Sequence, residues 1–212
     1  MQRWMTAGLA FALVVVCCTA ATAASPELLE GTWRYTNEAG DTCYEVTFGA
    51  DWEYQVETLG RMQGTYSYDE EAGEVIIILP GVDDEPDEVE TYKVFFEDGY
   101  LVLAKGDSFY RNKLLWQPEE PECILTGRWI EMLDEEDLKF SWWGAVYMEF
   151  DDDGTFTILV MQDRTEGEYV INDEGRVELE FLGELAEGIY SAKADLVLIY
   201  AGEESYACYY LP

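Results

Sequence analysis

Apolar and polar residues alternate along most of this chain. WEYQVE at 52–57 and VELEF at 177–181 both place apolar side chains on one face and carboxylates on the other. A period of two is typical of half-buried β-strands. Short acidic or glycine-containing stretches, such as those at 49–51 and 151–154, separate the runs and favour hairpin turns. We therefore expect an all-β protein, with at most a turn or two of helix near 134–140.

The runs between turns predict about eight strands in each half of the chain. Because short turns join most of these runs, consecutive strands should be antiparallel neighbours. The predicted ranges are 29–36, 43–48, 52–59, 62–68, 74–80, 89–97, 100–104 and 107–113, then 126–132, 145–150, 155–162, 166–171, 176–182, 187–193, 195–200 and 204–210.

Landmarks of the first half return in the same order in the second half. LEGTW at 29–33 corresponds to LTGRW at 125–129, and GEVIIIL at 73–79 corresponds to GRVELEF at 175–181. An ordered series of matches indicates duplication of one supersecondary unit, with length differences confined to the connections. Each half should therefore fold in the same way.

Eight short strands joined by hairpins leave two exposed edges unless the sheet closes on itself. A barrel of about eight strands removes those edges and is just wide enough for side chains or one small ligand. We predict an all-β fold of two tandem eight-stranded antiparallel up-and-down barrels, one at 25–115 and one at 125–212. The segment 116–124 is rich in Pro and Glu, which favours a stiff, solvated linker.

The start of the chain has the pattern of a secretory signal peptide. One basic residue, Arg3, is followed by an apolar run from Ala7 to Cys18 and then by small residues. We expect cleavage after the small-x-small sequence that ends at Ala23, without a lipid anchor, which makes 1–23 the signal peptide. An uncleaved anchor is disfavoured because about 20 apolar residues are needed to span a bilayer. The predicted protein is secreted or periplasmic and does not insert into a membrane.

Gly-x-Trp on the first strand, a Phe-turn-aromatic hairpin, Gly-x-Tyr and a last strand ending near Tyr together resemble the bacterial lipocalin-like domain, a calycin-type small barrel, here in tandem. In lipocalins the tryptophan plugs the closed end of the barrel and a basic residue of the last strand packs across it. The resemblance implies Arg111 or Lys113 over Trp33 as a structural barrel floor. Trp129 should lack such a partner, since no Lys or Arg follows Lys193. The resemblance also implies an extracellular barrel that could hold a small apolar ligand.

Aromatic side chains that might line a pocket would equally fill a barrel of this size, so a packed interior and a usable cavity both stay open. Trp142 and Trp143 lie in an insertion beside the predicted mouth of the second barrel. They are the candidate ligand-binding residues. The alternative is an apolar flap that only caps the core.

Acidic residues dominate the charge of the chain, with 45 Asp and Glu against 12 Lys and Arg and a net charge of −33. Loss of Arg3 with the signal peptide would make it −34. Such a charge repels nucleic-acid phosphates and anionic membrane surfaces, so we expect no nucleic-acid partner. Adaptation to a saline environment and attraction of a cationic protein would both explain it.

Cleavage of the signal peptide would leave three cysteines in an oxidising compartment. Closing an eight-stranded meander pairs its first and last strands, which would bring the residue before the first strand near the end of the last. Cys123 and Cys208 meet that condition, so we predict a disulfide between them. Cys43 is then a buried free thiol.

The chain contains no histidine, which rules out Ser-His-Asp and Cys-His catalysis, His-ligated zinc and imidazole acid–base chemistry. Paired carboxylates could still hydrolyse glycosides, but no spacing among 45 acidic residues singles out a pair. EFDDDGTFTILV at 149–160 lacks the bidentate Glu of a calcium-binding EF-hand loop, and the acidic run at 83–90 favours a solvated loop. We predict a protein without enzymatic activity, cofactor or metal.

Three classes of function remain. The first is a binding protein that holds a small apolar ligand in a barrel. The second is an acidic protein–protein interaction module, an inhibitor or adaptor of a cationic secreted enzyme, to which its charge would steer it. The third is a structural exoprotein with no specific ligand. We expect a monomer.

Overall fold

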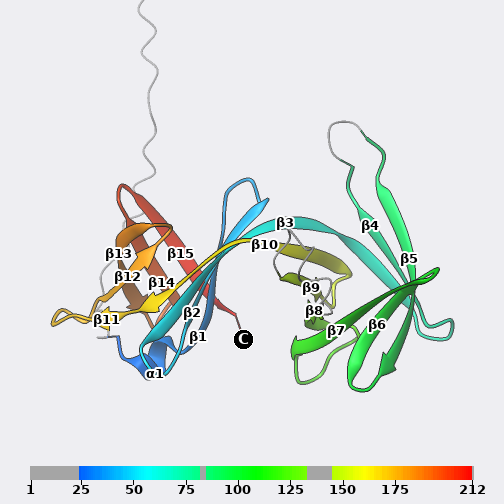
Figure 1. Cartoon of the computed structure of the whole chain (residues 1–212), viewed down its shortest axis with the longest axis horizontal. Coiled ribbons are helices and arrows are strands. Elements are labelled where there is room, and N and C mark those ends of the chain that lie inside the picture. Colours follow the sequence, from blue (N-terminus) through cyan, green and yellow to red (C-terminus); the bar gives the residue numbers. More distant parts are fainter. Residues whose placement is uncertain (1–23, 82–84, 133–144, 212) are drawn as a thin grey trace, which may run out of the picture.

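A computed structural model describes residues 24–81, 85–132 and 145–211, and these residues are almost entirely β-structure (Figure 1). The elements are α1 (Pro26–Leu29), β1 (Gly31–Thr36), β2 (Thr42–Phe48), β3 (Glu53–Asp69), β4 (Glu74–Leu79), β5 (Glu88–Glu97), β6 (Tyr100–Lys105), β7 (Ser108–Trp116), β8 (Gly127–Glu131), β9 (Val146–Phe150), β10 (Thr155–Glu168), β11 (Val170–Ile171), β12 (Val177–Phe181), β13 (Glu184–Ser191), β14 (Leu196–Ala201) and β15 (Glu204–Leu211). The prediction of an all-β fold is confirmed.

Eight of these strands form a closed antiparallel barrel. Strands β3 to β10 pair in chain order, and β10 pairs back onto β3. Closure gives every strand of this ring two neighbours, so the ring has no exposed sheet edge. The remaining strands, β11 to β15 with β1 and β2, lie outside the ring and attach to it through β2, which pairs with the first half of β3. We call these seven strands the second strand group.

Strands β3 and β10 are long and run from one part of the molecule to the other (Figure 1). They pair along their whole common length, from Glu53–Thr65 on one strand to Thr155–Glu168 on the other. The predicted hairpins between 59 and 62 and between 162 and 166 are therefore wrong. Leu59 and Leu159, near the middle of the two strands, are fully buried. A turn there would expose these side chains and break the ladder hydrogen bonds, so the continuous strands are favoured.

The strand pairing does not follow the predicted division at 116–124. Strand β8 pairs with β7, and β1 pairs with β15. Each strand that carries a Gly-x-Trp sequence therefore lies beside the last strand of the other predicted half, and the closed barrel takes strands from both sides of 116–124. The predicted linker connects two neighbouring strands of one barrel.

Both Gly-x-Trp tryptophans are buried and make the same hydrogen bond. The indole Nε1 of Trp33 donates to the carbonyl oxygen of Leu29 at 2.7 Å, and that of Trp129 donates to Leu125 at 2.8 Å. A buried indole N–H needs such a partner. The bond ties each tryptophan to the segment that precedes its strand and covers one end of a core.

Glycine is required at the first position of both motifs. Gly31 has a φ of +123° and Gly127 a φ of +134°, a region that side chains rarely adopt. A Cβ at Gly31 would lie 2.6 Å from the ring of Tyr210, and one at Gly127 would lie 2.4 Å from the carbonyl oxygen of Trp116. In both places the last strand of the other half passes too close for any side chain.

Two separate hydrophobic cores result. The core of the closed barrel comprises Val75, Ile77, Val94, Leu101, Leu103, Leu125, Trp129, Met148, Phe150 and Phe156. The core of the second strand group comprises Ala24, Leu29, Trp33, Val46, Phe48, Tyr54, Val56, Tyr169, Val177, Leu179, Phe181, Ala186, Tyr190, Val197, Ile199, Ala201, Tyr206 and Cys208. Aromatic rings fill much of both.

Arg111 does not cover Trp33, contrary to the expectation from the lipocalin resemblance. Arg111 is exposed on β7 and pairs with Glu97 at 3.0 Å. Trp33 packs edge-on against Tyr190 and Tyr210, with ring centroids 5.8 and 5.1 Å away. The reason is the strand pairing, because β7 belongs to the closed barrel and β1 to the second strand group.

The predicted disulfide between Cys123 and Cys208 is not formed. Both thiols are free, Cys208 in the core of the second strand group and Cys123 packed against the core of the closed barrel. Because β8 and β15 are not neighbours, the end of one does not approach the start of the other. Cys43 is a buried free thiol on β2, as predicted.

Cutting the chain between β7 and β8 should leave the molecule intact. A protease site placed at Glu119–Glu120, which are exposed, would yield two fragments that each supply strands to the closed barrel. We expect the cleaved protein to elute from a native sizing column at the volume of the uncut control. Its fragments should separate only in denaturant. Separation under native conditions would contradict the observed pairing and favour two independent domains.

Candidate functional site

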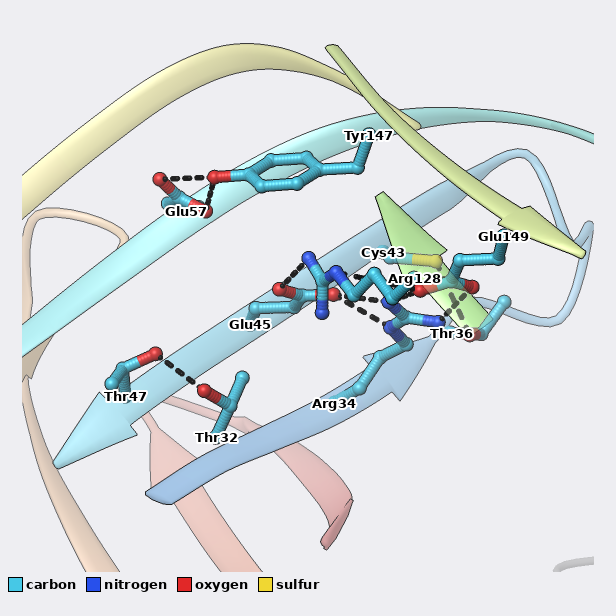
Figure 2. Close-up of polar contacts among 10 residues, drawn as sticks. All are labelled: Thr32, Arg34, Thr36, Cys43, Glu45, Thr47, Glu57, Arg128, Tyr147 and Glu149. Carbon is cyan, nitrogen blue, oxygen red and sulfur yellow. Dashed lines mark hydrogen bonds and ion pairs between the residues drawn. The ribbon is translucent and has the colours of Figure 1, made fainter. Parts of the chain in front are cut away.

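A cavity lies where the second strand group meets the closed barrel. It has a volume of about 590 Å³, and we call it the saddle cavity. It is lined by residues of β1 and β2 from the second strand group, of β8 and β9 from the closed barrel, and of β3, which carries Glu57 (Figure 2). It is lined by Thr32, Arg34, Glu45, Thr47, Gln55, Glu57, Arg61, Leu115, Trp116, Gly127, Arg128, Tyr147, Glu149, Asp151, Thr157 and Leu211.

Strand alternation places the charged residues of this cavity. Trp33 points into one core, so Arg34, the next residue, points out of it beside its cross-strand partner Glu45. On the barrel side, Arg128 lies opposite Glu149 across β8 and β9. The outer face of the β1–β2 pair lies opposite the outer face of the β8–β9 pair, so the two Arg–Glu pairs come into contact.

The four side chains form a ring of alternating charge (Figure 2). The Arg34 guanidinium donates from Nη2 to Glu45 Oε1 at 2.5 Å and from Nη1 to Glu149 Oε2 at 2.8 Å. Arg128 donates from Nη2 to Glu45 Oε2 at 2.7 Å, and its Nε lies 3.6 Å from Glu149 Oε1. The Glu45 side chain is only 3% exposed. Such bidentate, charge-assisted bonds fix both the positions and the orientations of the groups.

The opposite charges of the ring favour the ionised forms of Arg34 and Glu149. Burial alone would lower the pKa of Arg34, but the hydrogen bond that Arg34 donates to Glu149 and the charge of Glu45 outweigh burial, and the pKa is raised. Burial would likewise raise the pKa of Glu149, but the hydrogen bond and the charge of Arg34, followed by the charge of Arg128, hold it below its usual range. Both shifts favour the charged form.

A second acidic group, Glu57 on β3, has the opposite tendency. Its carboxylate accepts one hydrogen bond from the Tyr147 hydroxyl, which lies 3.2 and 3.0 Å from the two oxygens and shares its proton between them. Burial, followed by the nearby charge of Glu45, outweighs that bond and raises the pKa of Glu57. The pKa of Tyr147 is also raised, by burial and then by the charge of Glu57. Arg128 stacks over the Tyr147 ring at 4.5 Å, which joins this pair to the charged ring.

Further polar groups surround the ring. The Thr32 and Thr47 hydroxyls lie 2.9 Å apart, and Arg61 donates from Nη1 to the carbonyl oxygen of Gly40 at 2.9 Å. Among the described residues, the buried Nε of Arg128 has no acceptor within hydrogen-bond distance. A buried donor without an acceptor is costly, and the charge of Glu149, whose Oε1 lies 3.6 Å away, offsets that cost only in part.

A small apolar cluster supports the cavity from below. Cys43, Leu59, Tyr147 and Leu159 are buried together where β2, β3, β9 and β10 meet. The Thr36 hydroxyl lies 3.3 Å from the Cys43 sulfur. This packing fixes the backbones that carry Glu45, two residues beyond Cys43, and Tyr147, and it makes the cavity rigid on that side.

Of the predicted functional residues that the structure describes, none lines the saddle cavity. Trp33 and Trp129 are core residues, and Arg111 is exposed on the outside of the barrel. Trp142 and Trp143 lie outside the described residues. Their ligand-binding role stays a prediction.

The charged ring was not predicted from the sequence, although the sequence contains an indication of it. Arginine is scarce in this acidic chain, and yet one follows or precedes each Gly-x-Trp tryptophan, as Arg34 and Arg128. Such a rare cation beside a core residue is more informative than any one of 45 acidic side chains. Their shared partner, Glu45, carried no distinguishing mark.

The described part of the chain also limits other kinds of site. No three acidic or cysteine side chains within it gather closely enough to hold a metal ion. No helix found there is both long and apolar enough to cross a membrane.

The fold and site define an all-β protein with a closed eight-stranded antiparallel barrel and a charged cavity beside it. Neither a protein-family model, nor a curated protein, nor a solved structure matches this chain. The resemblance to lipocalin-like domains therefore stays a prediction.

Two isosteric substitutions in this cavity should have opposite effects on stability. Glu149→Gln removes a charge from the ring and leaves Arg34 and Arg128 partly unpaired, so we expect a loss of about 3 kcal/mol at pH 7. The melting temperature should fall by roughly 6–12 °C. Glu57→Gln removes a carboxylate that burial disfavours and should raise the melting temperature at pH 7.

The pH dependence provides the control. Because the pKa of Glu57 is raised in the folded protein, its contribution to the free energy of unfolding is present below the ordinary Glu pKa of about 4.3 and is lost as the pH rises. The gain from Glu57→Gln should therefore vanish near pH 4. The pKa of Glu149 is lowered, so its contribution is present at neutral pH and lost only in acid. Thermal melts of both variants from pH 4 to 8 measure these changes in melting temperature. An equal fall in melting temperature for both variants at pH 7 would contradict the prediction.

Proposed function

We propose that the protein is a secreted or periplasmic, non-enzymatic binding protein whose small-molecule ligand occupies the saddle cavity. The observation that carries this proposal is a cavity of about 590 Å³ with converging polar groups. Ligand sites commonly have volumes of about 300–1,000 Å³ and a few fixed polar groups that orient the ligand. The charged ring and the Glu57–Tyr147 pair supply such groups in a preorganised form.

The saddle cavity is a better candidate than the interior of a barrel. Trp129, Phe150 and Phe156 occupy the core of the closed barrel, and these rings leave the interior filled with side chains. Three smaller cavities, like the saddle cavity, are lined in part by β3, and none of the four is lined mainly by core residues. The apolar ligand expected from the lipocalin resemblance is therefore replaced in this proposal by one that meets polar groups.

We propose further that the chain is a duplicated lipocalin-like unit, released from a signal peptide at 1–23, whose two copies exchange strands. The second strand group would then be a second barrel. In support, β11 follows β10 after a single residue, Tyr169, and pairs with β12. The Tyr169 amide also donates to the carbonyl oxygen of Trp52, which continues the contact between β10 and the start of β3. The saddle cavity would lie between the two exchanged barrels.

Glycoside hydrolysis is the catalytic alternative, because Glu57 and Glu149 have pKa values shifted in opposite directions within one cavity. The hydrogen bonding favours binding instead. Both Glu149 oxygens accept from Arg34, and the two Glu57 oxygens share one hydrogen bond from Tyr147. Each carboxylate is thus held in a fixed position by a protein partner, as in a preorganised binding surface.

Native mass spectrometry of the mature protein, purified gently from its own secretory compartment, tests the proposal. We expect an additional mass of a few hundred daltons that is lost on denaturation. Thr32→Phe would place an aromatic ring in the saddle cavity and should abolish that mass. Thr91→Phe makes the same change on an exposed position of β5, away from the cavity, and should retain it.

The other outcomes discriminate between the functions. A ligand retained by the Thr32→Phe variant would place the binding site elsewhere, for example inside a barrel. A bare mass in the wild type, together with salt-sensitive capture of a basic secreted protein, would favour the acidic protein–protein interaction module instead.

A further inference from the structure

We infer that the ligand of the saddle cavity is a neutral, polyhydroxylated molecule of the size of a mono- or disaccharide. This inference rests on the proposed binding function and specifies the chemistry of the ligand. It follows from the charge balance of the lining, from its mixture of donors and acceptors, and from the apolar residues at its rim.

The charge balance argues against an ionic ligand. The cavity is lined by the cations Arg34, Arg61 and Arg128 and by the acids Glu45, Glu57, Glu149 and Asp151. An anion approaching Arg34 or Arg128 would meet Glu45 and Glu149, which already accept hydrogen bonds from these two arginines. A cation approaching these carboxylates would meet the two guanidinium groups. Like-charge contacts of this kind cost several kcal/mol in an interface, so a neutral molecule is favoured.

The hydrogen-bonding groups suit hydroxyls. The lining offers both donors and acceptors, from Thr32, Thr47, Gln55 and Thr157 as well as from the charged side chains. A hydroxyl is donor and acceptor at once, so a molecule with several hydroxyls can match such a mixture without leaving groups unpaired.

The rim supplies the apolar part of the contact. Leu115, Trp116 and Leu211 border the cavity, and Trp116 is 38% exposed at the end of β7. A sugar ring has an apolar face of C–H groups, and an indole provides a flat apolar surface of matching size. A ring stacked on Trp116 could direct its hydroxyls toward the charged ring below.

Isothermal titration calorimetry with defined probes tests this inference. The neutral probes are glucose, galactose, cellobiose and maltose, and the charged probes are phosphate, malonate and putrescine. We expect at least one neutral probe, and none of the charged ones, to bind with a dissociation constant below about 10 mM. In parallel, the indole N–H signal of Trp116 in NMR spectra should shift on binding.

Two tryptophan variants locate the site. Trp116→Ala should weaken saccharide binding at least tenfold. Trp52→Ala removes a tryptophan of similar exposure, 44% against 38% for Trp116, that does not line the cavity, and it should change binding less than twofold. The Thr32→Phe variant should abolish binding, and circular dichroism of all three variants controls for folding.

The outcomes separate this inference from the proposed function. Binding of phosphate, malonate or putrescine that Thr32→Phe abolishes would keep the saddle cavity as a ligand site and overturn the neutral class. Saccharide binding that survives Thr32→Phe would overturn the assignment to this cavity. Failure of every saccharide to bind the wild type would overturn the inference, while the native mass measurement would decide the binding function independently.

Discussion

Strands β3 and β10 pair along their common length and form a two-stranded ribbon that runs from one hydrophobic core to the other (Figure 1). Tyr54 and Val56, near the start of β3, belong to the core of the second strand group, and Phe156, near the start of β10, belongs to that of the closed barrel. The ribbon therefore contributes buried side chains to both cores, through β3 to one and through β10 to the other. The same ribbon sets β2 beside β9, and so it creates the saddle cavity.

Alternation of polar and apolar residues was enough to predict the strands, because each side-chain position shows directly whether it faces a core. It could not predict where β3 and β10 continue rather than turn. Gly60 and Arg61 have the composition of a hairpin, and only the burial of Leu59 against Leu159, a contact across 100 positions of sequence, favours the straight strand. Local propensity is overruled here by tertiary packing.

Closure posed a different difficulty. If the two halves of the chain share one pattern of apolar residues, their last strands, β7 and β15, present the same apolar face to β1. β1 could then pair with β7 as well as with β15, and the sequence pattern cannot distinguish them. The errors about Arg111 and the disulfide both followed from this one choice of partner. The charged ring was equally hidden, since Arg34 meets Glu149 and Arg128 meets Glu45 across 115 and 83 positions.

The ring helps to resolve that ambiguity. A buried ion pair adds little net stability, because the cost of removing its charges from water offsets their attraction. Its main effect is on specificity, since any arrangement that buries the arginines without their partners is strongly disfavoured. In the observed pairing, Arg34 and Arg128 share Glu45, and each lies near Glu149. If each half closed on itself, β1 and β8 would belong to different barrels without the common ribbon, and this shared coordination would be lost. The charges that form the candidate site thereby also favour the strand pairing that creates it.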